Sequence, residues 1–296
     1  MQVQADPEAR QGAATQQGFR LPDGRHLGVA CYGSEQGRPM IYLHGGGSSR
    51  LEARYADGHA RRNGLRLIAV DRPGYGLSAP LPVYGFRAVG RELLSLADQL
   101  DLRRFGVIGM SAGGPFALQL AAMAPARVRC VALINPSVDT RHADWQATPL
   151  WMRLLTRLTM SPPLMRAVLR RMTADPAKAA AKMVLKEGWS EQELQCFVAS
   201  VKEGMRQEAG LAHMHAEAMM VLDRRWELEW WQVTCPVLAI CGQRDAGRYF
   251  YQAMARRYPN ITNLEIAGPH MPIVPGTAWD RIGALASQQI VDNAGR

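Results

Sequence analysis

The sequence predicts an α/β protein with a mostly parallel, eight-stranded sheet, helices on both faces of the sheet, and an inserted helical segment. Three observations lead to this fold class. Short apolar runs bounded by turn residues recur along the chain, helical patterns separate most of them, and the alternation stops between residues 139 and 230. Strands that alternate with helices pair in parallel and leave the helices on the two faces of the sheet.

An antiparallel hairpin is predicted to begin the sheet. Residues 1–16 lack an apolar signal segment, and we expect them to form a disordered tail. Apolar runs at 19–21 and 27–32 flank Pro22-Asp23-Gly24, which is typical of a tight turn between paired strands.

Six further apolar runs predict the remaining strands. They lie at 40–43, 65–70, 104–108, 128–134, 237–241 and 261–266, with helical patterns between them, for example at 89–100 and 246–258. We therefore expect an α/β core formed by residues 17–138 and 231–290.

The segment 139–230 is predicted to be a helical cap inserted after the sixth strand. It contains nine of the fifteen methionines, and Pro162-Pro163, Asp175-Pro176 and Gly188 divide it into several helices. Methionine and tryptophan on such a cap could line an adaptable apolar pocket. They could equally pack the cap onto the core, and the sequence leaves both interpretations open.

Composition restricts the class of protein. A chain of 296 residues that is 47% hydrophobic can bury a large core. The sequence contains no run of 18 apolar residues, so we expect no membrane-spanning helix. The net charge of +9 arises from 31 arginines and 4 lysines against 26 acids and is spread along the chain, so we expect no nucleic-acid partner. Five cysteines without metal-type spacing indicate free, mostly buried thiols and a cytoplasmic protein.

The most informative motif is Gly109-Met110-Ser111-Ala112-Gly113, which lies between a predicted strand and a predicted helix. A Gly-x-Ser-x-Gly sequence in this context is typical of a nucleophile elbow. The flanking glycines permit a close helix–strand approach, and the helix N-terminus favours developing negative charge. The alternative is a glycine-rich turn with no catalytic role.

A serine nucleophile needs a base, and the base needs a group that orients it. Asp245 and His270 each follow a late strand, and the order Ser111, Asp245, His270 is that of elbow hydrolases. Asp139, after the sixth strand, is the alternative acid.

The other histidines, none of which follows a late strand, are His26, His44, His59, His142, His213 and His215. A metal site at His213 and His215 is disfavoured because residues two apart face different sides of a helix.

Acyl transfer also needs hydrogen-bond donors for the oxyanion of the tetrahedral intermediate. The loop His44-Gly45-Gly46-Gly47 follows a strand, and its glycines allow backbone N–H groups to approach a substrate oxygen. The predicted donors are the N–H groups of Gly46 and Ala112. A phosphate-binding loop is the alternative, but the Gly-Lys-Ser/Thr sequence that it requires is missing.

Together these motifs resemble the α/β-hydrolase superfamily over residues 19–285. The segments 44–50, 71–78 and 109–116 are similar to the HGxPGSR, DRPGYGxS and GxSGGGPY motifs of a capped bacterial subgroup. The resemblance implies Ser111 as nucleophile, His270 as base, Asp245 as its orienting acid, and Gly46 with Ala112 as the oxyanion hole. The chain departs from the subgroup pattern at Gly47, Ala112 and Phe116, and residues 273–276 stand where a glutamate is often found.

We expect the protein to be a cofactor-free serine hydrolase that cleaves a carboxylic ester or a related acyl compound. The expected substrate is a small molecule with an apolar part. Aminopeptidase, lactonase, thioesterase and carbon–carbon hydrolase activities use the same triad. An aminopeptidase would need carboxylates in the cap, for which Glu203, Glu208 and Glu217 are available. Epoxide hydrolases and haloalkane dehalogenases are disfavoured because their elbow has aspartate at the position of Ser111. A non-catalytic small-molecule receptor on the same fold is the alternative from another class.

Overall fold

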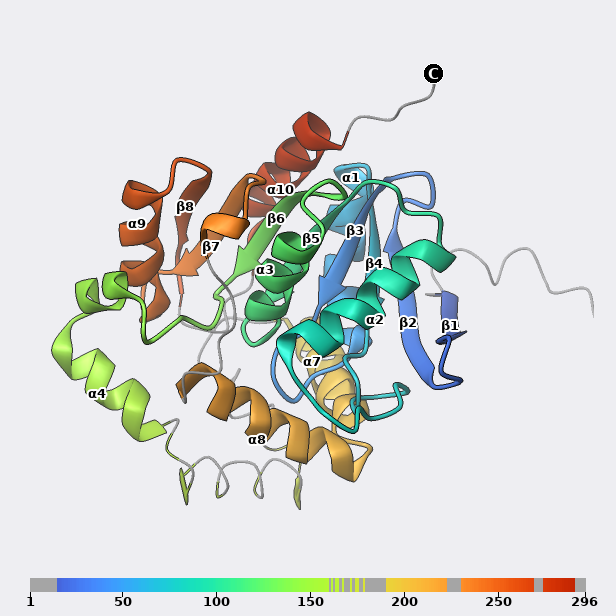
Figure 1. The fold of residues 1–296 in the computed structure, drawn as a ribbon, viewed down its shortest axis with the longest axis horizontal. Helices are drawn as coiled ribbons and strands as arrows, with labels where there is room; N and C mark the ends of the chain where they lie inside the picture. The colour runs from blue at the N-terminus through green and yellow to red at the C-terminus, as the bar shows by residue number, and fades with distance from the viewer. Residues whose placement is uncertain are drawn as a thin grey trace, which may run out of the picture.

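The eight strands form one sheet in the order β1-β2-β4-β3-β5-β6-β7-β8 (Figure 1). The computed structural model describes residues 15–159, 190–222, 230–268 and 274–290, together with scattered positions between 161 and 178. Strands β3 to β8 pair in parallel, and β2 pairs antiparallel with both β1 and β4. The predicted fold class is confirmed.

The antiparallel edge consists of β1 (Thr15–Arg20) and β2 (His26–Gly33), joined by the predicted turn. Phe19 lies opposite Leu27, and the pairing extends back to Thr15 opposite Cys31. The first strand therefore begins at Thr15, inside the segment expected to be a disordered tail, because β2 is long enough to pair with it. The rest of that expected tail, residues 1–14, lies outside the described residues.

The six parallel strands match the apolar runs to within two residues at either end. They are β3 (Arg38–Leu43), β4 (Leu65–Val70), β5 (Phe105–Met110), β6 (Val128–Ile134), β7 (Val237–Gly242) and β8 (Ile261–Ile266). Every residue of β5 and β7 is buried. Such continuous apolar runs are expected of central parallel strands covered on both faces.

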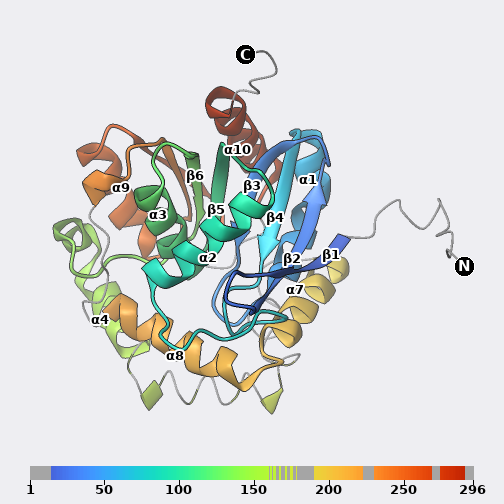
Figure 2. The ribbon, with the colours of Figure 1, turned by 45° about the vertical axis from the view of Figure 1, so that its right-hand side comes forward.

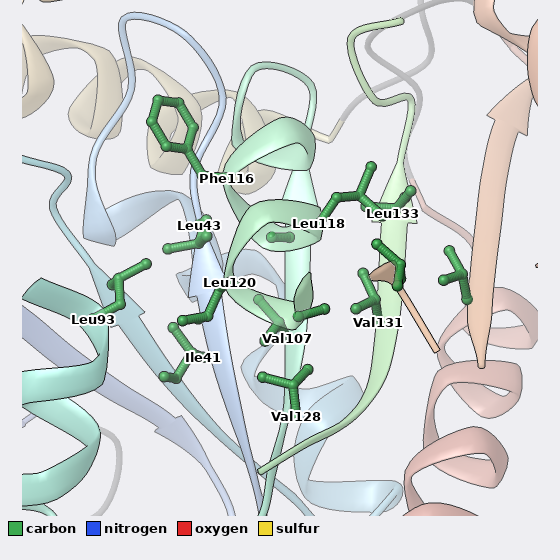
Figure 3. Packing of buried hydrophobic residues seen from close by; sticks show 14 of the residues in the cluster. Ile41, Leu43, Leu93, Val107, Phe116, Leu118, Leu120, Val128, Val131 and Leu133 are labelled. Atoms are coloured by element: carbon green, nitrogen blue, oxygen red, sulfur yellow. The ribbon is translucent and has the colours of Figure 1, made fainter. Parts of the chain in front are cut away.

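Two layers of helices cover the sheet. One face is covered by α2 (Phe86–Gln99), α3 (Gly113–Met123) and α9 (Gly247–Arg257). The other is covered by η2 (Arg50–Ala56), α1 (Asp57–Arg62) and α10 (Gly276–Gln289) (Figure 2). Strand side chains alternate between the two layers, as the period of two requires: Ile41 and Leu43 pack in the first, Met40 and Tyr42 in the second. Figure 3 shows Leu118 and Leu120 of α3 against the first layer.

Three described helices lie between β6 and β7, in the segment predicted to be a helical cap. They are α4 (Leu150–Thr159), α7 (Glu191–Gly204) and α8 (Glu208–Leu222), which we call the helical insertion. A short helix, η3 (Ala143–Ala147), precedes them, and η4 (Trp230–Gln232) follows them. Both views show α7 and α8 at the end of the sheet that bears the carboxyl ends of the parallel strands (Figures 1 and 2).

All five cysteines are free, and Cys130, Cys235 and Cys241 are buried, as the apolar runs around them predict. Burial raises the pKa of the Cys130 thiol to about 12 and that of Cys235 to about 11. Among the described residues, no helix combines the length and the apolar character needed to cross a bilayer.

Candidate active site

Ser111 occupies the turn between β5 and α3 in a strained backbone conformation. Its φ of 47° lies in the left-handed region, which a residue with a side chain rarely adopts. Two hydrogen bonds tie this conformation to β6 and the loop after it: the Ser111 N–H donates to the Ile134 carbonyl at 2.9 Å, and the Ser137 N–H donates to the Ser111 carbonyl at 3.0 Å. The neighbouring strand thus fixes a strained serine at a helix N-terminus, as a nucleophile elbow requires.

The glycines of the motif are required by packing. A Cβ on Gly109 would lie 2.7 Å from Gly114 Cα, and a Cβ on Gly113 would lie 2.8 Å from the His44 carbonyl oxygen. Contacts this short do not occur in folded proteins, so larger residues would separate α3 from β5 and from the loop after β3.

The glycine loop after β3 lies against the elbow. A Cβ placed on Gly45 would be 3.6 Å from Ser111 Cβ, and one on Gly46 would be 3.6 Å from Ala112 Cβ. Gly46 is partly exposed, whereas the residues on both sides of it are buried. The structure therefore brings together Ser111 and the two residues, Gly46 and Ala112, predicted to supply the oxyanion donors.

A buried carboxylate behind this loop fixes its path. The Gly45 N–H donates to both oxygens of Glu52, at 3.1 and 3.2 Å, and the Tyr42 hydroxyl donates to Glu52 at 2.9 Å. Burial raises the pKa of the Glu52 carboxyl, and these hydrogen bonds partly oppose the shift. Sequence reasoning missed Glu52, because its role depends on η2 folding back under the loop.

His44 has a structural position. The side chain is fully buried, and both burial and the Arg72 guanidinium lower the pKa of the imidazole well below its usual value. The Arg72 N–H donates to His44 Nε2 at 3.1 Å, which assigns the proton to Nδ1 for donation to the Gly45 carbonyl at 2.7 Å. His44 thus holds the loop by two neutral hydrogen bonds.

Asp71 closes a turn. Its carboxylate accepts the Arg50 N–H at 2.6 Å and the Leu77 N–H at 2.9 Å, and it pairs with the Arg50 guanidinium at 2.7 Å. Arg50 also pairs with Glu203 of α7 at 2.8 Å. One arginine thereby links the core to the helical insertion.

Both candidate acids lie in the loops that follow neighbouring strands. Asp245, after β7, is buried and accepts the Gly247 N–H at 2.6 Å. Asp139, after β6, is also buried and accepts the Arg141 N–H at 3.0 Å. Burial raises the pKa of the Tyr251 phenol well above its usual value, and the charges of Asp139 and Asp245 add to that shift. Both carboxylates are therefore close enough to the Tyr251 phenol to act on it electrostatically.

Asn135 holds the ends of β6 and β7 in register beside these acids. Its φ of 41° is left-handed, its N–H donates to the Ile240 carbonyl at 2.8 Å, and its side-chain oxygen accepts the Gly242 N–H at 2.6 Å. The sequence analysis did not name this residue. Asparagine tolerates left-handed backbone better than most residues, so an asparagine directly after a strand is a signal that could have indicated such a position.

His270, the predicted base, lies outside the described residues, in the segment 269–273 after β8.

Helix α8 approaches the glycine loop from the insertion. The Met214 side chain would lie 3.8 Å from a Cβ placed on Gly46. His213 donates from Nδ1 to the Pro73 carbonyl at 2.7 Å and stacks on the Tyr84 ring with centroids 4.1 Å apart. A methionine of the insertion therefore lies beside the predicted oxyanion loop, as one of the two interpretations of the methionine-rich segment requires.

Two of the three insertion carboxylates named as candidates for binding a substrate ammonium are paired with arginines. Glu217 is buried and accepts two hydrogen bonds from the Arg72 guanidinium, at 3.1 and 3.0 Å, and one from the Tyr84 hydroxyl at 2.5 Å. Arg72 is fully buried and also donates to the His44 carbonyl. Glu203 pairs with Arg50, and Glu208 is exposed. Among the described residues, no group of three metal-ligating side chains is assembled.

Comparisons with known proteins show what the chain is similar to. Residues 38–158 match the model of the alpha/beta hydrolase fold family. The chain is 33% identical over 114 residues to haloalkane dehalogenase 2 of Mycobacterium tuberculosis, covering 38% of each chain. It is 25% identical over 154 residues to an sn-1-specific diacylglycerol lipase of Danio rerio, covering 51% of this chain and 47% of the lipase. The matched segments span less than half the length of these two curated relatives.

Solved structures extend the likeness to the whole fold. ALR0039 from Nostoc sp. PCC 7120 superimposes with a TM-score of 0.71 at 18% identity, over 93% of this chain and 98% of that one. Together with the family match over residues 38–158 and the eight-stranded sheet, this superposition shows that the chain has the fold of the α/β hydrolases.

Proposed function

We propose that this protein is a serine hydrolase that cleaves a carboxylic ester, or a related acyl compound, through an acyl-enzyme on Ser111. The observation that most supports the proposal is the strained Ser111 turn lying against the Gly45-Gly46 loop. A left-handed serine at a helix N-terminus is a costly conformation, and such strain is concentrated at functional sites. A glycine-rich turn with no catalytic role would not need it.

Each proposed role follows from the chemistry of acyl transfer. Ser111 Oγ attacks the carbonyl carbon while His270 accepts its proton, and Asp245 orients His270 and stabilises its charged form. The N–H groups of Gly46 and Ala112 stabilise the oxyanion that develops on the carbonyl oxygen. His270 then protonates the leaving group, and water, activated by the same histidine, releases the acid from Ser111. No step requires a metal or an organic cofactor.

The substrate is proposed to be a small molecule with an apolar part. The side chain that α8 places beside Gly46 is a methionine, which adapts to irregular apolar shapes. Glu203 and Glu217 pair with Arg50 and Arg72, which disfavours the aminopeptidase alternative because neither carboxylate is positioned alone for a substrate ammonium.

The proposal is tested with short p-nitrophenyl esters. Ser111→Ala should lower kcat by several orders of magnitude, on the order of 10⁶-fold in the best-studied serine enzyme, because the nucleophile is lost. Ser287→Ala, on the distant helix α10, is the control and should keep wild-type rates. Unchanged hydrolysis in Ser111→Ala would refute the proposal.

A fluorophosphonate probe separates the enzyme from a non-catalytic receptor on the same fold. A working hydrolase should be labelled rapidly at Ser111, and mass spectrometry should place the adduct on that residue. Absence of labelling, together with absence of turnover, would favour the receptor.

A further inference from the structure

Helix α4 presents a large apolar surface to solvent. In the described part of the chain, six of the eight exposed large apolar side chains lie between residues 150 and 164. Trp151 is 64% exposed, and Leu150, Leu154 and Leu158 are 55% to 63% exposed. Scattered exposed leucines are ordinary, but a contiguous patch of this kind marks an interaction site.

The spacing places these side chains on one stripe. Leu150, Leu154 and Leu158 recur every fourth residue and share one face, with Trp151 beside them. Met152 is half-buried and Arg157 is exposed. Helix α4 is therefore amphipathic, but its broad apolar face points away from the protein, the reverse of an ordinary surface helix.

The charged residues of the sequence segment that contains the stripe have a single sign. Between Trp145 and Ala174 the sequence contains five arginines and no aspartate or glutamate. Two of them, Arg153 and Arg157, lie on α4, three residues after Leu150 and Leu154 and so along one edge of the stripe. An apolar face with leucine and tryptophan, bordered by arginine, is the pattern of helices that lie in the interface of a membrane.

We propose that α4 is an interfacial helix through which this protein binds reversibly to an anionic phospholipid surface. Leu150, Leu154 and Leu158 enter the acyl boundary, Trp151 lies at the headgroup level, and Arg153 and Arg157 contact lipid phosphates. Both views show α4 at the periphery of the molecule (Figures 1 and 2).

Charge favours this occupant over a second copy of the chain. A two-fold interface on α4 would bring the same stripe of each copy together and place the arginines of one beside those of the other. The net charge of +9 adds repulsion between copies, whereas an anionic surface neutralises it.

The experiment is vesicle cosedimentation of the full chain with phosphatidylcholine alone and with added phosphatidylglycerol. Binding should be at least tenfold tighter with phosphatidylglycerol and should weaken with salt. Leu154→Gln with Leu158→Gln should lower the partition by about 100-fold or more, since two leucines no longer leave water. Arg153→Gln with Arg157→Gln should lower it about 30-fold, or roughly fivefold per arginine.

Val83→Gln is the matched control, because Val83 is 78% exposed but lies outside α4, and it should bind like the wild type. Brominated lipid should quench tryptophan emission in the wild type and much less in Trp151→Phe. Equal binding by the leucine variant and the control would overturn the proposal, as would absence of wild-type binding. A leucine variant that turns a dimer into a monomer, with no vesicle binding by either form, would assign the stripe to a second copy. None of these readouts depends on Ser111.

Discussion

At the scale of single residues, the site is defined by backbone conformations that only certain residue types allow. Ser111 and Asn135 are left-handed although both have side chains, and each is fixed by hydrogen bonds to a neighbouring strand. Glycine is required at 113 for a different reason, because its α-carbon faces the backbone of residues 43 and 44 across a gap too small for a methyl group.

Gly113→Ala should therefore destabilise the protein and impair the proposed active site. Overpacking of this kind costs about 1 to 3 kcal/mol, and the added methyl group would also displace the loop that includes Gly46. Gly58→Ala is the control: Gly58 is exposed within α1, and a Cβ there would lie 3.6 Å from the Arg62 side chain, an ordinary van der Waals contact. That variant should be neutral or more stable by about 0.5 to 1 kcal/mol. Chemical denaturation measures both, and equal stability of the two variants would contradict the packing argument.

The two candidate acids are separated by amide substitutions. Asp245→Asn keeps an oxygen for the Gly247 N–H, so the fold should persist, but kcat should fall by about 10⁴-fold if Asp245 orients the base. Asp139→Asn should leave kcat within a few-fold of the wild type, because the Asp139 carboxylate accepts hydrogen bonds from Arg141 in its own turn. Ester hydrolysis measured on both variants decides the assignment, and the opposite ranking would transfer the role to Asp139.

At the scale of elements, the insertion is joined to the core by buried polar contacts. Arg72, from the loop after β4, binds both Glu217 of α8 and the carbonyl of His44 in the glycine loop. Gly204 at the end of α7 lies against the backbone of the same loop, where a Cβ would be 2.9 Å from the Gly47 carbonyl oxygen. The position of the insertion and the shape of the predicted oxyanion loop are thus determined by shared contacts.

Breaking the Arg72–Glu217 pair from one side should be costly. Glu217→Leu leaves a buried guanidinium uncompensated, for which a loss of about 3 to 5 kcal/mol in unfolding free energy is expected. Adding Arg72→Met should recover part of that loss, because the unpaired charge is removed. Denaturant unfolding of the two single variants and the double variant measures the coupling.

The exposed ion pair of Arg61 and Asp57 is the comparison for this double-mutant cycle. Its side chains are 53% and 28% exposed, so Arg61→Gln should cost no more than about 0.5 kcal/mol. Strictly additive effects of Glu217→Leu and Arg72→Met would show that the buried pair does not couple the insertion to the core.

At the scale of the whole molecule, the sheet divides the core into two apolar layers. Three cysteine thiols are buried in this core. Because burial raises the pKa of Cys130, Cys235 and Cys241, native protein at pH 8 should react with iodoacetamide only at Cys31 and Cys196, which are half-buried. All five should react after unfolding. Mass spectrometry of the labelled chain checks this, and rapid native labelling of Cys130 would show that the core opens locally.

The positions of the strands along the chain could be predicted in large part because local patterns specify them. Parallel strands at the centre of a sheet are continuous apolar runs, and those at 65–70 and 128–134 have the observed bounds, as does the edge strand at 261–266. The hairpin start could not be placed from the sequence, since Thr15-Gln16-Gln17 is polar and becomes a strand only by pairing with β2. Glu52 and Arg72 were missed for the same reason, because their partners lie on other elements.

The sequence by itself determined the class of fold, the elbow serine, and the residues that follow the ends of the strands. These features are local, because the periodicity of a strand, a turn that needs glycine and the order of motifs are all contained in short segments. Only the tertiary structure decided that Gly45 and Gly46 lie against Ser111 and Ala112, that Glu203 and Glu217 pair with core arginines, and that the apolar face of α4 points outward. Each of these depends on packing between segments far apart in the chain, which no local pattern specifies.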